Sequence, residues 1–202
     1  MTDSSDLLGS LMEQLGGGGI AQIGKSLGVS GADVTKVLAG SLPAIMAGLT
    51  RQTSTSGGAE GLLGALDRDH DGSIMDDVAG FLGSAGAVAA GTGILGHVFG
   101  GRQAHVESAV SRSSGVDLAS VAKIMAMAAP LVMGALGKAK RQHGFDASGL
   151  AAALGQQEHT ARQVSPSAVD MFAKMLDSDG DGDSMDDIVK LGSSLLGGLF
   201  KA

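Results

Sequence analysis

The fold is decided by the stretch SGADVTKVLAGSLPAIMAGL, residues 30–49, and by the similar stretch DLASVAKIMAMAAPLVMGAL, residues 117–136. Each begins with a residue suited to cap a helix, Ser30 or Asp117, and continues with apolar residues at helical spacing. Pro43 and Pro130 stand at the same place in the two stretches, where each predicts a kink in a helix or a division between two helices. No part of the chain alternates apolar and polar residues over a long run. The sequence therefore predicts an all-α fold.

The two stretches belong to a longer internal repeat. A shift of 87 positions aligns residues 7–49 with residues 94–136 without a gap. After the aligned part, each half reaches a short acidic loop, and the second half first has an insertion, residues 155–176. We therefore expect two tandem helical repeats, each followed by an acidic loop and a further helix. The expected units are residues 1–92, with the acidic loop 67–78, and residues 93–202, with the insertion 155–176 and the acidic loop 177–188.

The composition excludes several classes of site. The chain has 202 residues, of which 34 are Gly and none is Cys, Trp or Tyr. Disulfide scaffolds, cysteine-ligated zinc and thiol catalysis all need cysteine. The net charge is −7, and the two acidic loops contribute −10 of it, so the rest of the chain is only slightly basic. The sequence has no stripe of basic residues that could bind a phosphate backbone, and it has few aromatic side chains that could stack on bases. We therefore expect no nucleic-acid partner.

Residues 94–138, ILGHVFGGRQAHVESAVSRSSGVDLASVAKIMAMAAPLVMGALGK, resemble the YidB-like bacterial family, a domain of unknown function. The resemblance is clear in the second repeat and weaker in the first. It implies a multihelical fold of two three-helix repeats with a homeodomain-like topology. It supplies no catalytic residues, and the acidic loops go beyond the part of the family pattern that the sequence matches.

Both acidic loops have the spacing of a calcium-binding loop. Such a loop needs carboxylates at alternate positions, a glycine at position six and a backbone carbonyl next. Position twelve, which is Glu in an EF-hand, is Val78 or Ile188 here. The candidate ligands are Asp67, Asp69, Asp71, the Ser73 carbonyl, Asp76 and Asp77 in the first loop, and Asp177, Asp179, Asp181, the Asp183 carbonyl, Asp186 and Asp187 in the second. We expect these EF-hand-like loops to bind two Ca²⁺, with Mg²⁺ and Mn²⁺ as the other candidate ions.

Residues 19–26, GIAQIGKS, fit the letters of a phosphate-binding loop. A helix-like segment precedes them instead of a strand, and the equivalent residues 106–113 are VESAVSRS, so we interpret them as helix. No nucleophile and base stand at a usable spacing. We therefore expect no enzymatic activity, no catalytic residues and no small-molecule substrate.

The N-terminus carries Asp3, Asp6 and Glu13 where a signal peptide has basic residues, which predicts a cytoplasmic protein, although secretion by a route without such a signal stays open. The uncharged run 78–101 is interpreted as a Gly-rich bend between two helices and not as a membrane span. The leading hypothesis is a structural or interaction module that binds Ca²⁺ and forms a homo-oligomer or binds a protein partner. The alternative is a metal-independent partner-binding domain whose acidic loops are solvated turns that cap the next helix.

Overall fold

The computed structural model describes residues 11, 13 and 15–164, and every regular element in that part of the chain is helical. The predicted all-α class is thereby confirmed. In chain order the elements are η1 (Leu15–Gly19), α2 (Ile20–Leu27), α3 (Gly31–Thr53), α4 (Gly58–Arg68), η2 (Ser73–Asp76), α5 (Val78–Leu82), α6 (Ala87–Phe99), η3 (Gly100–Arg102), α7 (Gln103–Ser114), α8 (Leu118–His143) and α9 (Ala147–Val164). The second acidic loop, residues 177–188, lies outside the described residues, as does most of the expected insertion.

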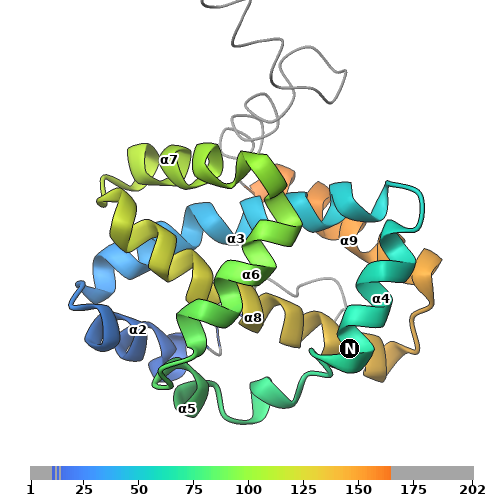
Figure 1. Ribbon diagram of the computed structural model, residues 1–202, viewed down its shortest axis with the longest axis horizontal. Helices are drawn as coiled ribbons and strands as arrows, with labels where there is room; N and C mark the ends of the chain where they lie inside the picture. The colour runs from blue at the N-terminus through green and yellow to red at the C-terminus, as the bar shows by residue number, and fades with distance from the viewer. Residues whose placement is uncertain (1–10, 12, 14, 165–202) are drawn as a thin grey trace, which may run out of the picture.

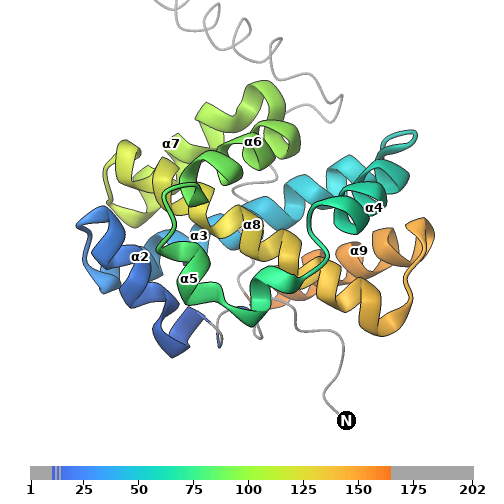
Figure 2. The ribbon, with the colours of Figure 1, turned by 60° about the horizontal axis from the view of Figure 1, so that its bottom comes forward.

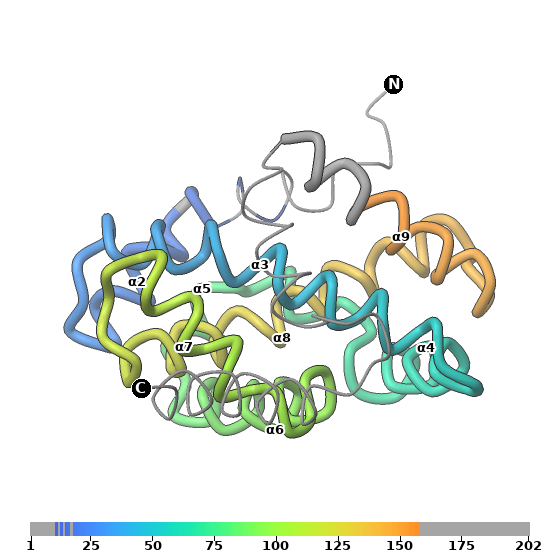
Figure 3. The backbone as a smooth tube through the Cα atoms, turned by 90° about the horizontal axis from the view of Figure 1, so that it is seen from above, coloured from blue at the N-terminus to red at the C-terminus, as the bar shows by residue number. Residues whose placement is uncertain are grey.

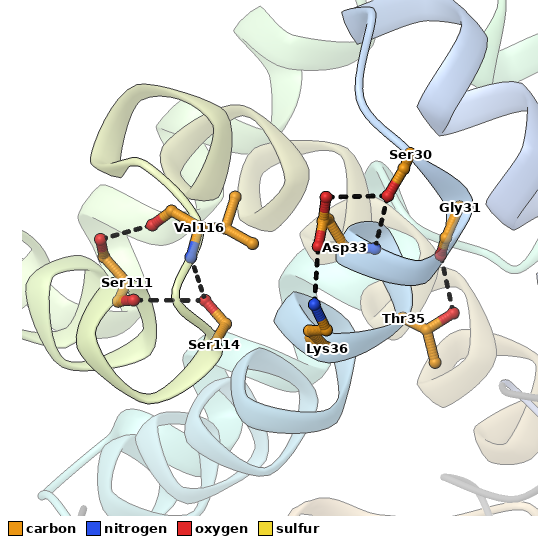
Figure 4. Close-up of polar contacts among 8 residues, drawn as sticks. All are labelled: Ser30, Gly31, Asp33, Thr35, Lys36, Ser111, Ser114 and Val116. Atoms are coloured by element: carbon orange, nitrogen blue, oxygen red, sulfur yellow. Dashed lines mark hydrogen bonds and ion pairs between the residues drawn. The ribbon is translucent and has the colours of Figure 1, made fainter.

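The two long helices begin as their sequences predict. The Ser30 side chain accepts a hydrogen bond from the Asp33 N–H at 3.1 Å, and the Asp117 side chain accepts one from the Ser120 N–H at 2.9 Å. Figure 4 shows the Ser30 cap beside the turn that precedes α8, where the Ser111 hydroxyl donates to the Val116 carbonyl at 2.6 Å. Each side-chain cap satisfies an N–H that has no partner inside the helix.

The two prolines do not divide their helices. Pro43 lies inside the 23-residue α3 and Pro130 inside the 26-residue α8, so division into helix pairs, one of the two predicted outcomes, is wrong. Each proline removes one backbone hydrogen bond and tends to break an isolated helix. Pro130 is itself buried among the core residues of α8, and this packing holds the helix together across it.

Helices α3 and α8 form the centre of the molecule (Figures 1 and 2). α8 makes its most extensive contact with α6 and also packs against α3, α7, α4 and η2. α3 packs against α2 and α4 of its own half and against α7 and α9 of the other half. Figure 3 shows the same helices from above. The largest fully buried side chains come from both halves and include Leu38, Ile45 and Leu49 of α3 and Met125, Met127 and Leu131 of α8.

Glycines allow some helices to approach very closely. Gly91 of α6 lies against the backbone of Ala126 in α8, and a Cβ added to Gly91 would overlap the Ala126 carbonyl oxygen. Gly48 of α3 faces α6 in the same way, because a Cβ there would lie 2.5 Å from Val98 Cγ1 and 2.9 Å from Phe99 Cε1. A chain with so few aromatic residues fills its core partly by bringing backbones together.

Two of the described helices, Gly31–Thr53 and Leu118–His143, are long and apolar enough to cross a membrane by length and composition. Their most apolar windows are 56% and 67% buried inside the molecule. Most of this apolar surface therefore packs against other helices of the same chain. The uncharged run 78–101 is divided into α5, a turn and α6, as the bend interpretation predicts.

The first acidic loop as a candidate metal site

The first acidic loop, residues 67–78, connects α4 to α5 through the short helical turn η2. Asp67 is in the last turn of α4, and Asp69 follows the end of that helix. Gly72 has φ +94°, a conformation that favours glycine, and this allows the chain to turn into η2. The Asp77 side chain then caps α5 by accepting a hydrogen bond from the Gly80 N–H at 2.8 Å. The loop thus connects two helices, as its sequence predicts.

The loop rests against α8 through glycines on both sides. A Cβ on Gly137 would overlap the His70 carbonyl oxygen, and a Cβ on Gly134 would overlap the Ile74 side chain. A Cβ on Gly72 would lie 2.8 Å from the Lys138 amide nitrogen. Because two of these three contacts involve backbone atoms on both sides, glycine is required for the loop to lie this close to the helix.

Two aspartates of the loop pair with cations at the C-terminal end of α8. Lys140 Nζ forms an ion pair with Asp67 Oδ1, and Arg141 Nη1 lies 3.3 Å from Asp71 Oδ2. The Asp71 and Arg141 side chains are 52% and 51% exposed, whereas Lys140 is only 17% exposed, so solvent screens the Asp71–Arg141 pair more than the Asp67–Lys140 pair. These cations join two segments far apart in the sequence and neutralise part of the loop's charge.

The Asp71 carboxylate is also held by its own loop. Its Oδ1 accepts a hydrogen bond from the Ser73 N–H at 2.9 Å. This hydrogen bond is the main reason that the pKa of Asp71 lies below its usual value, with smaller contributions from the Ser73 hydroxyl and Arg141. The pKa of His70 is also lowered, because the ring is partly removed from water, and nearby Asp69 opposes that shift.

The predicted ligands of the first loop are not gathered around one point. Asp67 and Asp71 face α8, Asp77 caps α5, and Asp69 and Asp76 are exposed. Among the residues that the structure describes, no group of three or more His, Cys, Asp or Glu side chains is arranged to hold a metal ion. All six predicted ligands of the second loop lie outside the described residues. Sequence reasoning missed Lys140 and Arg141 as partners of the loop, and their position in the last turn of a helix was the only signal.

The segment that fits the letters of a phosphate-binding loop is helical. Residues 20–26 lie in α2, and Gly24 is buried there. A Cβ on Gly24 would lie 2.7 Å from the Val29 carbonyl oxygen, so this glycine allows α2 to pack closely against the turn that follows it. The structure therefore gives this segment a packing role.

We expect the stability of the protein to fall in two steps as the pH is lowered. The folded protein lowers the pKa of His70 below 6.5, so it disfavours the charged ring, and this contribution is complete above pH 6.5 and is lost progressively below it. The pKa values of Asp33, Asp71, Asp117 and Asp146 are lowered below 3.8, so their contributions are lost only as the pH falls below that value. Denaturant unfolding followed by circular dichroism over a pH series measures both steps. His70→Asn is expected to remove the first step and leave the second, and an unchanged first step would contradict the role given to His70.

Comparison with known families identifies the chain. Residues 9–139 match a family described as bacterial protein of unknown function (DUF937). The chain belongs to this family. The match extends through the first acidic loop and most of α8, and it ends before α9 and before the second acidic loop. It confirms a bacterial family of unknown function, with which the YidB-like resemblance agrees. No curated protein and no solved structure matches the chain.

Proposed function

We propose that this DUF937 protein is a non-enzymatic module of two tandem helical repeats whose acidic loops bind Ca²⁺ and thereby control how the loops pack on the helices. The repeat is supported by the positions of its elements. α3 and α8 begin 87 residues apart, and left-handed Gly28 and Gly115, also 87 apart, precede them. The boundary expected between residues 92 and 93 falls within α6, so we propose that the second repeat begins at Ala87.

The observation that carries the cation proposal is the pairing of Asp67 and Asp71 with Lys140 and Arg141. The first loop already has the glycine turn of a calcium loop, and two of its carboxylates, Asp67 and Asp71, are paired with side-chain cations of α8. The Asp71–Arg141 pair is open to solvent on both sides and contributes little, so a divalent ion held by several carboxylates displaces it at low cost. Ca²⁺ is preferred over Mg²⁺ because a loop rich in carboxylates supplies the larger number of oxygen ligands that the larger ion takes. Binding would draw Asp67 and Asp71 away from α8 and loosen the contact between the loop and that helix.

Native mass spectrometry tests this proposal by counting bound ions after EDTA treatment and after addition of Ca²⁺. We expect two ions on the unaltered chain, one after Asp69→Asn or Asp179→Asn, and none when both substitutions are present. Asp33→Asn is the matched control, since Asp33 is an aspartate outside the loops, and this variant should retain both ions. If the unaltered chain takes up no Ca²⁺ at millimolar concentration, the cation proposal is wrong.

Removal of the competing cations sharpens the test. Lys140→Met and Arg141→Met keep the apolar stems and delete the charges. Because each substitution removes a cation that pairs with a loop carboxylate, each should tighten Ca²⁺ binding to the first loop by up to about fivefold. Titration calorimetry on a chain that carries Asp179→Asn isolates the first loop. Weaker binding in these variants would show that the two cations do not compete with the metal.

A second candidate function is a metal-independent partner-binding domain. The observation that favours it is that the loop's aspartates already serve the fold, since Asp77 caps α5 and Asp67 and Asp71 pair with α8. In that case Asp69→Asn together with Asp179→Asn leaves the unfolding temperature unchanged whether Ca²⁺ or EDTA is present. A loss of Ca²⁺-dependent stabilisation in the same variant supports the cation-binding proposal instead.

A further inference from the structure

The two halves of the described chain cover each other's apolar surfaces. We define the N half as residues 15–82 and the C half as residues 87–164. α3 of the N half packs against α6, α7 and α9, and α8 of the C half packs against α2, α4 and η2. Leu38 and Leu49 from α3 and Met127 and Leu131 from α8 are buried and belong to one hydrophobic cluster that draws on both halves. Each half therefore depends on the other to complete the core.

One exposed turn joins the two halves. Residues 83–86, Gly-Ser-Ala-Gly, lie between α5 and α6 and are all exposed to solvent (Figure 1). The other turns between successive α-helices from α2 to α9 contain a glycine with a positive φ, at positions 28, 57, 72, 100, 115 and 144. The turn at 83–86 contains no residue with a positive φ. No left-handed residue therefore fixes the change of direction between the halves.

The two ends of this turn have helical backbone dihedrals. Gly83 has φ −83° and ψ −9°, and Gly86 has φ −89° and ψ −11°, both in the right-handed helical region. Ser84 donates its N–H to the Phe81 carbonyl at 2.9 Å, one residue short of an α-helical hydrogen bond. A change in the backbone of the two residues between these glycines, Ser84 and Ala85, would join α5 and α6 into one helix from Val78 to Phe99.

We propose that the protein forms a dimer by exchanging C halves with a second copy of itself through straightening of the 83–86 turn. When the turn straightens, the halves of one chain separate and leave their contact surfaces open. A second copy in the same form supplies the missing halves and rebuilds the same contacts between chains, so no new interface has to be formed except at the joined helices. The exchange requires no metal, so its failure leaves the cation proposal unaffected.

Substitutions in the turn test the exchange. Gly86→Ala combined with Ser84→Ala raises helix propensity in the turn, and a Cβ at Gly86 meets nothing within 4 Å, so the closed monomer tolerates it. After refolding at high concentration, size exclusion with light scattering should show the dimerisation constant increased by about tenfold or more. Gly93→Ala is the matched control, because Gly93 lies within α6, outside the turn, and an added Cβ meets nothing within 4 Å. That control should leave the monomer–dimer ratio unchanged, and a turn variant that stays monomeric at every concentration would refute the exchange.

Cysteine pairing distinguishes an exchanged dimer from a surface dimer. A Cβ on Gly40 of α3 would lie 3.8 Å from Ser113 Oγ of α7, and the chain has no cysteine of its own. One chain carries Gly40→Cys, the other carries Ser113→Cys, both have the altered turn, and they are refolded together. An exchanged dimer yields a disulfide between the two chains, whereas a dimer of closed chains yields none and overturns the proposal. A single chain with both substitutions and the unaltered turn should form the disulfide within itself, which verifies the geometry.

Discussion

Gly91→Ala is expected to destabilise the protein more than any other glycine-to-alanine substitution proposed here. The added Cβ would overlap the Ala126 carbonyl oxygen, which belongs to the backbone of α8 and cannot rotate away. α6 must therefore move away from α8, and this crossing is the most extensive helix contact in the described chain. Overpacking of this kind typically costs about 1–3 kcal/mol. We expect the upper end of that range because the obstructing atoms of Ala126 belong to the backbone.

Gly93→Ala provides the matched comparison for this prediction. Gly93 lies in the same helix with no atom within 4 Å of the added Cβ. Alanine there should raise the free energy of unfolding by about 0.5–1 kcal/mol, since glycine is unfavourable inside a helix. Unfolding in urea followed by circular dichroism measures both variants, because the chain has no tryptophan for fluorescence. Equal stability of the two variants would show that α6 and α8 do not cross at Gly91.

Gly137→Ala is expected to release the first acidic loop from α8. The new Cβ would overlap the His70 carbonyl oxygen, so the loop backbone has to lift away. The pairs made by Asp67 and Asp71 would then be lost together with the burial of Met75, which is 9% exposed. We expect the free energy of unfolding to fall by about 1–3 kcal/mol.

Hydrogen exchange shows whether this loss is local. In the Gly137→Ala variant, amides of residues 69–77 should exchange faster, while those of α3 and α6 keep their protection relative to global unfolding. Gly61→Ala in α4 is a control, since its Cβ meets nothing within 4 Å. If residues 69–77 are as protected in the Gly137 variant as in the control, the loop does not rest on α8.

The parts of the fold that the sequence predicts are those determined by nearby residues. Ser30 and Asp117 cap their helices through hydrogen bonds to residues three positions later, so the cap is visible in a short window. The left-handed Gly72 and the cap at Asp77 likewise follow from the amino-acid sequence of the loop itself. The continuity of the proline-containing helices was not predictable in this way, because packing from distant segments sustains it.

For the candidate site, the sequence predicted the residues of the loop itself but not their partners elsewhere in the chain. The spacing of the acidic residues identifies the turn and its carboxylates, but the partners of Asp67 and Asp71 come from residues 73 and 70 positions later in the chain. Those partners depend on how α8 crosses the loop, and that crossing depends on Gly134 and Gly137. The sequence of α8 contains these glycines, but it does not indicate which segment of the chain packs against them. Long-range contacts of this kind depend on how the helices pack, which a local sequence pattern does not reveal.

The interlocking of the two halves has a consequence for the growing polypeptide on the ribosome. α3 leaves the ribosome well before α7 and α9, the helices that cover much of it. At about 5–20 residues per second, synthesis of the second half takes several seconds, during which the apolar faces of the first half stay uncovered. A nascent chain in that condition needs protection from aggregation until the later helices arrive. We therefore expect the unfinished chain to expose more apolar surface than the finished molecule, which exposes few large apolar side chains in its described part.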